Sequence, residues 1–265
     1  MPEDDAARVG RYYDDVIFEA EVTRLRDQFP LELAATSRYI ERYVPAGSTV
    51  AEVGVGGGLY SELLARRGCR LRLVDVSRKL LDSVRARLPE AAAHYASATN
   101  LPLEDASCDA VLMLGPLYHL TRVEDRLQAV SEAARVLKRG GLLLAAGINR
   151  FTYLRDLFRE APQLVLERRE FHAQYLRDGV LNPGVAPPIG HAHLTTRAEF
   201  HDLFAHQFEE IKLVAVESFA GPWQARFRKF PPGVAEAWLE LIEQTAETPE
   251  AFGLTDHLLY IGRVP

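Results

Sequence analysis

Two carboxylates flank a glycine-rich turn near residue 55, and this group is the part of the 265-residue chain best suited to bind a ligand. Glu52 lies in a short apolar run, glycines follow at positions 54, 56, 57 and 58, and Asp75 ends the next apolar run. Glycine lets the backbone approach a bound group closely, and an acid about 20 residues further on can accept hydrogen bonds from ribose hydroxyls. The pattern predicts a site for a cofactor that contains a nucleoside.

A strand, a turn, a helix and a second strand are needed to bring these residues together. Residues 49–53 have the length and β-branched content of a buried strand, and residues 71–74 form a similar run. Between them, Leu59, Leu63 and Leu64 have helical spacing, which ends at Gly68. The first turn of that helix directs unpaired N–H groups at the glycines, as a ligand-binding turn requires.

The type of cofactor follows from two details of the turn. A dinucleotide fingerprint has glycine at the sixth position counted from Gly54, where this chain has Leu59. The pattern Glu-x-Gly-x-Gly-x-Gly over residues 52–58 resembles instead the first motif of class I S-adenosylmethionine-dependent methyltransferases. That resemblance, clear over about residues 36–150, implies S-adenosyl-L-methionine as cofactor.

The resemblance also implies roles for single residues. Gly54, Gly56 and Gly58 would admit the methionine moiety of the cofactor. Glu52 would hold its amino end, and Asp75 would bind both ribose hydroxyls.

The adenine end of the expected site departs from the family in one place. Val76 and Leu114 would sandwich the ring, and Gly115 would lie at the mouth of the site. Ser97 stands where the family often has an acid that contacts the adenine amino group, so backbone groups at Ala98 would have to hold the ring.

Strands alternate with helices through the first 150 residues, which predicts an α/β fold with a doubly wound parallel sheet. The resemblance extends this to a seven-stranded, mostly parallel sheet with helices on both faces and an antiparallel last strand. We expect a single domain over residues 1–265. Its parts are an N-terminal helical cap (1–46), a cofactor-binding core (47–150), a lid or substrate insertion (151–196) and the end of the sheet (197–265) with a helical insertion (218–253).

The residues that face the acceptor are less clear from the sequence. His119 and Tyr118 follow a strand that should end at the ligand side of the sheet, so they are the candidate catalytic residues, with loop positioning and packing as the alternatives. Candidate substrate-binding residues elsewhere in the chain are Tyr13, Arg24, Arg150 and His193. His191-x-His193 lacks diagnostic metal-ligand spacing, so no metal site is expected.

Composition narrows the class of partner. The net charge of −6 and the pI near 5.8 argue against nucleic acid or an anionic membrane as the main partner. We expect a cytoplasmic enzyme that methylates an N, O or C atom of a small-molecule acceptor, with a homodimer as one option for its assembly. The alternatives are a non-catalytic cofactor-binding subunit on the same fold and, less favoured, an NAD-dependent oxidoreductase.

Overall fold

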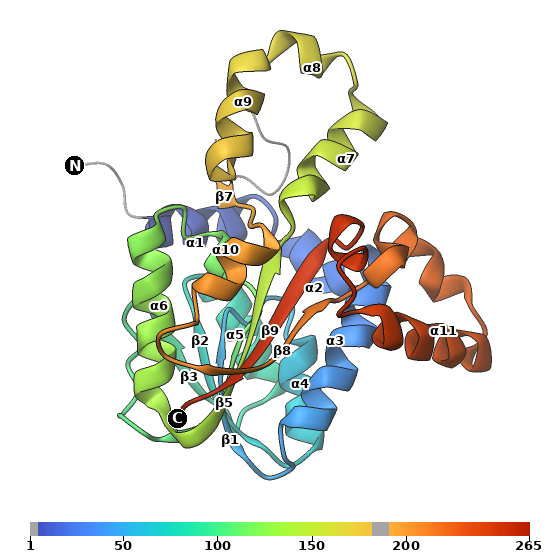
Figure 1. Cartoon of the computed structure of the whole chain (residues 1–265). Helices are drawn as coiled ribbons and strands as arrows, with labels where there is room; N and C mark the ends of the chain where they lie inside the picture. The colour runs from blue at the N-terminus through green and yellow to red at the C-terminus, as the bar shows by residue number, and fades with distance from the viewer. Residues whose placement is uncertain (1–4, 182–190) are drawn as a thin grey trace.

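The computed structural model describes residues 5–181 and 191–265, and its centre is a seven-stranded sheet (Figure 1). In sheet order the strands are β3 (Ala92–Tyr95), β2 (Arg70–Asp75), β1 (Thr49–Val53), β4 (Cys108–Met113), β5 (Leu137–Ile148), β9 (His257–Arg263) and β8 (Glu209–Ala215). All neighbours pair in parallel except β9, which runs antiparallel to both β5 and β8. The predicted fold class, including the antiparallel last strand, is confirmed.

Helices cover both faces of the sheet because successive strand residues point to opposite faces. Val50 packs with one set of helices while Ala51 packs with the other. The first set is α3 (Pro30–Tyr43), α4 (Leu59–Arg66), α5 (Arg78–Arg87) and α11 (Pro232–Thr245); the second is α6 (Val123–Val136) and α10 (Arg197–Asp202). Both cores are continuous, so the edge of the sheet where the parallel strands end is held rigidly.

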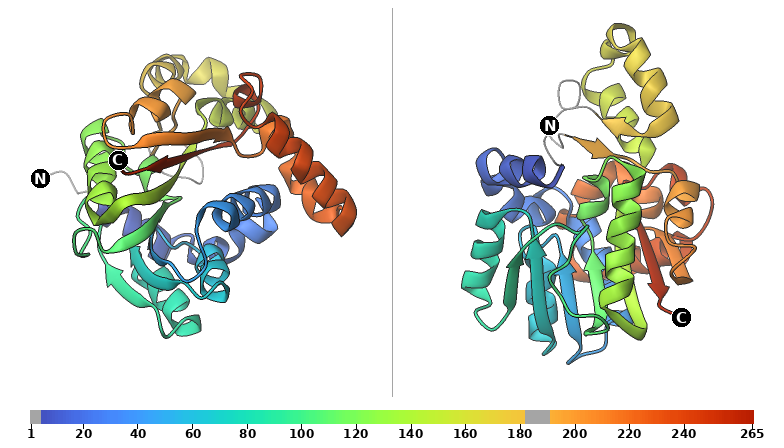
Figure 2. Two further views of the ribbon diagram at one scale, coloured as in Figure 1. Left: turned by 60° about the horizontal axis from the view of Figure 1, so that its bottom comes forward. Right: turned by 90° about the vertical axis from the view of Figure 1, so that its left-hand side faces the viewer.

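Two N-terminal helices, α1 (Asp5–Asp15) and α2 (Phe18–Asp27), lie over that carboxyl edge (Figure 2). Their packing is close, because a Cβ atom at Gly10 would lie 2.4 Å from the backbone oxygen of Val76, and one at Gly57 would lie 2.7 Å from that of Val22. The helical cap predicted for this region therefore begins at Asp5 and rests directly on the glycine turn and on the end of β2.

Substitution of Gly10 tests this close packing. Gly10→Ala should push α1 away from Val76 and lower the free energy of unfolding by about 1–3 kcal/mol, the usual cost of overpacking. Amide hydrogen exchange across residues 5–27 should rise. Gly233→Ala in α11 is the control, since a Cβ there meets nothing within 4 Å, and it should leave stability unchanged or slightly increased. Unchanged exchange in Gly10→Ala would mean that α1 does not need this contact.

The insertion after β5 forms an arm of α7 (Arg150–Glu160), α8 (Leu164–Glu167) and α9 (Arg169–Asp178), which rises above the same edge (Figure 1). Helices α8 and α9 are separated at Arg168. A two-stranded sheet of β6 (Val180–Leu181) and β7 (Ala192–His193) closes the base of the arm. Within the described residues, no helix is long and apolar enough to cross a membrane.

The second insertion contains the 3₁₀ segment η2 (Ser218–Lys229) and α11, and it exposes apolar surface. Trp223 is 60% exposed and Trp238 is 40% exposed. These aromatic side chains lie away from the cavity described below, whose lining does not include them.

Candidate cofactor and acceptor site

A cavity at the carboxyl edge of the sheet joins the glycine turn to the N-terminal helices. Of the residues predicted for cofactor binding, the cavity is lined by Gly54, Gly56, Asp75, Val76, Ser97, Ala98, Leu114 and Gly115. The turn needs glycine at position 56, where φ is +49° and a Cβ atom would lie 3.0 Å from Glu21 Oε1. The predicted nucleoside side of the site is thus assembled around one space.

Asp75 is the anionic group at the centre of this side. One carboxylate oxygen accepts a hydrogen bond from the Val55 N–H at 2.8 Å, and the other accepts one from the Ser77 N–H at 2.8 Å. Burial raises the pKa of Asp75 to about 6 despite these bonds, so the group is ionised at neutral pH. The N–H groups of Gly56 and Val76 also direct hydrogen bonds at this carboxylate, which therefore lies among backbone donors at the edge of the cavity.

Two residues predicted for cofactor binding lie outside the cavity lining. Glu52 is buried beneath the turn, where it accepts a hydrogen bond from Ser61 Oγ at 2.5 Å, and burial raises its pKa to about 8. Gly58 faces α5 instead, since a Cβ atom there would lie 2.6 Å from Val84. The structure gives both residues contacts that support the turn from behind.

The predicted acceptor residues Tyr13, Tyr118 and His119 line the same cavity. The Tyr13 hydroxyl lies 2.9 Å from His119 Nε2, and His119 Nδ1 lies 3.4 Å from the backbone oxygen of His191. Burial lowers the pKa of His119 to about 4, so the ring is neutral at pH 7. In the tautomer that satisfies both contacts, Nδ1–H donates to His191 and Nε2 accepts from Tyr13, so His119 orients Tyr13.

An ion pair from α2 also borders the cavity. Arg24, predicted to bind substrate, donates from Nε to Glu21 Oε2 at 2.7 Å, and both residues line the cavity. Glu21 did not stand out in the sequence. Its spacing of three from Arg24 in a helix was the available signal.

Arg150 and His193 are not brought to this cavity. Arg150 is buried at the base of the arm, where it donates to the backbone oxygen of Leu194 and pairs with Glu199. His193 lines a different cavity with Arg126 and Glu199, and burial lowers its pKa to about 4. The structure therefore gives Arg150 contacts that hold the base of the arm to α10, and it places His193 at a separate cavity.

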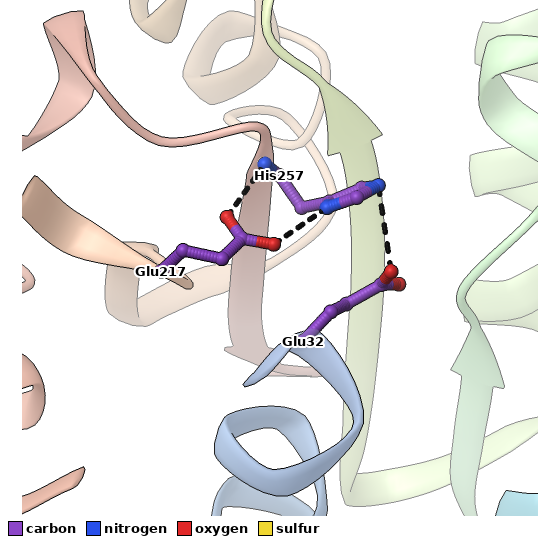
Figure 3. Close-up of side chains that lie close together, drawn as sticks. All are labelled: Glu32, Glu217 and His257. Carbon is purple, nitrogen blue, oxygen red and sulfur yellow. Dashed lines mark hydrogen bonds and ion pairs between the residues drawn. The ribbon is translucent and has the colours of Figure 1, made fainter. Parts of the chain in front are cut away.

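Three buried residues that the sequence did not single out form a cluster beside the cavity (Figure 3). His257 Nδ1 lies 2.7 Å from Glu217 Oε1, and His257 Nε2 lies 3.6 Å from Glu32 Oε2. Glu217 Oε2 also accepts hydrogen bonds from the Thr255 hydroxyl and from the N–H groups of Asp256 and His257. The facing carboxylates Glu32 and Glu217 raise the pKa of His257 to about 9 against the effect of burial, so the ring is an imidazolium at neutral pH.

This pKa predicts a dependence of stability on pH. The imidazolium stabilises the fold fully below the unfolded pKa near 6.5, and that contribution is lost as pH rises through about 9. Between pH 6 and pH 10, the stability advantage of the wild type over His257→Gln should shrink by about 3 kcal/mol. Urea unfolding of both proteins across this range measures it, and a constant difference would show that His257 is uncharged.

Comparisons with known proteins agree with this geometry. Residues 51–145 match a family model described as a methyltransferase domain. The chain is 35% identical over 133 residues to a probable S-adenosylmethionine-dependent methyltransferase of Mycolicibacterium smegmatis, a match that covers 50% of each chain. It is also 35% identical over 104 residues to a tRNA (carboxymethyluridine(34)-5-O)-methyltransferase of Mus musculus, covering 38% of this chain and 15% of that protein.

Similarity to solved structures extends over the whole fold. Magnesium protoporphyrin IX methyltransferase from Synechocystis, solved with bound S-adenosylhomocysteine, superimposes with a TM-score of 0.62 over 99% of this chain and 100% of that one, at 14% identity. At that identity the likeness concerns the fold. The chain spans about half the length of the mycobacterial relatives that it matches.

Proposed function

We propose that the chain transfers a methyl group from S-adenosylmethionine to a small-molecule acceptor, since residues 51–145 match a methyltransferase domain and half of the chain resembles a probable S-adenosylmethionine-dependent methyltransferase. One observation carries the proposal. A single cavity is lined by Asp75 and the glycine turn at one end and by Tyr13, Tyr118 and His119 at the other. Such a cavity can hold a nucleoside cofactor and an acceptor side by side.

The residues present fit the cofactor. Asp75 lines the cavity as a carboxylate that can accept hydrogen bonds from ribose hydroxyls, and glycine at position 56 lets Glu21 approach the turn closely. We assign Glu21 and Arg24, which form an ion pair beside the turn, to the ammonium and carboxylate of the methionine end. In this assignment Glu21 takes the role that the sequence suggested for Glu52.

When bound, the cofactor supplies a methyl group on a positively charged sulfur. The chain then has to align the acceptor in line with that methyl group and to exclude water. The cap supplies part of the wall for this purpose through Ala6, Val9 and Tyr13. Tyr13 and Tyr118 are neutral, since burial raises the pKa of each hydroxyl, so they present uncharged rings and hydroxyls to the acceptor.

A small molecule is the acceptor class that the cavity supports best. Helices α1 and α2 pack directly on the turn, which leaves a space bounded by side chains from the cap and from the sheet. The net charge of −6 opposes association with a polyanion such as tRNA. The exposed tryptophans of the second insertion offer a surface for a homodimer.

Transfer of a labelled methyl group tests the proposal. The protein is incubated with methyl-labelled S-adenosylmethionine and, separately, with a small-molecule fraction, total tRNA and total protein from cells. Label in the small-molecule fraction is the expected result. Label in tRNA or protein would show that the acceptor is that macromolecule and not a small molecule. Cofactor binding with no transfer to any fraction would favour a non-catalytic binding subunit.

A further inference from the structure

We propose that the acceptor is an amine, bound as its ammonium ion against the Glu32 carboxylate before methylation. This inference rests on the proposed function and specifies its substrate class. It starts from Glu32, a carboxylate that borders the cavity and whose Oε2 atom has no hydrogen-bonding partner in the described part of the chain.

Glu32 belongs to the first turn of α3 and is only 8% exposed, yet it lines the cavity that also contains Asp75. Its Oε2 atom is inaccessible to solvent and accepts no hydrogen bond from the residues that the structure describes. The cation nearest to it among the described residues, His257 Nε2, lies 3.6 Å away. The compensation for this buried carboxylate is therefore one long contact with a shared imidazolium, which is costly, and a ligand donor on the cavity side of Glu32 would stabilise it.

The charges around Glu32 favour a positively charged ligand. Arg24 pairs with Glu21 at 2.7 Å, and His257 pairs with Glu217 at 2.7 Å. His257 also forms a longer ion pair with Glu32 at 3.6 Å, so one imidazolium serves two carboxylates and one negative charge is left over. One ammonium group restores the balance, whereas a carboxylate or phosphate on the acceptor would increase the excess of negative charge.

A metal ion fits this cluster poorly, although Glu32, Glu217 and His257 lie close enough together to suggest one. A histidine ligand must be neutral, whereas His257 lies between two carboxylates that stabilise its protonated form. Glu217 is also a poor metal ligand, because its Oε2 atom already accepts three hydrogen bonds. Binding of an organic ammonium ion requires neither deprotonation of His257 nor the loss of a hydrogen bond to Glu217.

The rest of the cavity suits an ammonium ion and its apolar substituent. Tyr13, Tyr60 and Tyr118 contribute to the lining, and aromatic faces attract cations. Leu25 and Leu120 add apolar wall. In an amine with a compact apolar or aromatic substituent, the ammonium group can therefore contact the aromatic rings and the substituent can pack against the apolar wall.

Glu32 can also prepare the nucleophile. Burial raises the pKa of the Glu32 carboxyl, so it can take one proton from the bound ammonium ion and leave a neutral amine. The nitrogen lone pair then forms the N–C bond as the C–S bond breaks, and that electron pair stays on sulfur. The positive charge moves from sulfur to the methylated nitrogen, so the total charge in the cavity is unchanged.

Thermal unfolding in the presence of S-adenosylhomocysteine tests the amine subsite. The wild type, Glu32→Gln and the control Glu41→Gln, which alters an exposed residue of the same helix, are each saturated with S-adenosylhomocysteine. Each is titrated with a series of ammonium chlorides from methylammonium to phenethylammonium. The corresponding alcohols at equal concentration and potassium chloride at equal ionic strength are the controls.

At least one ammonium ion should raise the Tm of the wild type and of Glu41→Gln well above the effect of its alcohol, and the shift should be lost in Glu32→Gln. Equal effects of alcohols, a shift that persists in Glu32→Gln, or no shift with any ammonium ion would each overturn the proposal. A larger shift with zinc chloride that disappears in Glu32→Gln would replace it with a metal site. Failure of S-adenosylhomocysteine to bind the wild type would instead contradict the proposed function itself.

Discussion

Asp75→Ala should weaken the binding of S-adenosylhomocysteine more than 100-fold. The substitution removes the carboxylate that we assign to both ribose hydroxyls, and two hydrogen bonds to a charged group contribute about 3 kcal/mol or more. Because the pKa of Asp75 is about 6, affinity in the wild type should also decline as pH falls below 6. Calorimetric titration at pH 7.5 and pH 5.5 measures both effects.

The control is Asp82→Ala, which removes an exposed carboxylate from the neighbouring helix α5. It should bind S-adenosylhomocysteine as the wild type does. Asp75 also accepts hydrogen bonds from Val55 and Ser77, so circular dichroism must first show that the variant is folded at the temperature of the titration. A folded Asp75→Ala protein with wild-type affinity would exclude Asp75 from the cofactor site.

Glu217→Gln should lower the free energy of unfolding by about 3–5 kcal/mol, the usual cost of breaking a buried ion pair. Glu217 is fully buried, and it provides the 2.7 Å partner of the His257 imidazolium. The amide leaves that cation without its partner and presents N–H groups where three donors now point. Urea unfolding at pH 7 measures the loss.

Glu247→Gln is the matched control, because Glu247 pairs with Lys212 at the surface and its side chain is 55% exposed. Its effect should stay within about 0.5 kcal/mol. Part of the loss in Glu217→Gln should be recovered at pH 10, where His257 is deprotonated in the wild type as well. A loss below 1 kcal/mol at pH 7 would show that the pair does not stabilise the fold.

The sheet and the nucleoside side of the cavity could be predicted because their signals are local. A short apolar run, positive-φ glycines and a helix stop at Gly68 lie within 27 residues, and the structure places them as one unit. Ser77 caps the next helix, since its hydroxyl accepts a hydrogen bond from the Leu80 N–H. Local hydrogen-bonding patterns of this kind depend little on distant parts of the chain.

The distinction between lining and supporting residues could not be made from the sequence. Glu52 and Gly58 belong to the same motif as Asp75, but the alternation of side chains along β1 and the closeness of α5 turn them away from the cavity. The motif specifies the shape of the backbone. Which atoms reach the ligand depends on how helices from other parts of the chain pack against the motif.

The cluster of Glu32, Glu217 and His257 was missed because these residues come from three distant segments of the chain. Glu217 follows the end of β8, and His257 begins the antiparallel strand β9, so both lie at the carboxyl edge of the parallel strands. That edge is where ligands bind, and the antiparallel direction of the last strand was already expected. Following each strand to the edge it reaches would have identified both residues, whereas Glu32 required the tertiary packing of α3.

We propose that this chain binds S-adenosylmethionine at the cavity over Asp75. Isothermal titration calorimetry of the wild-type protein with S-adenosylmethionine and, in parallel, with NAD measures this binding. One molecule of S-adenosylmethionine should bind per chain, and NAD should not bind. Binding of NAD, or of neither compound, by the folded protein would contradict the proposal.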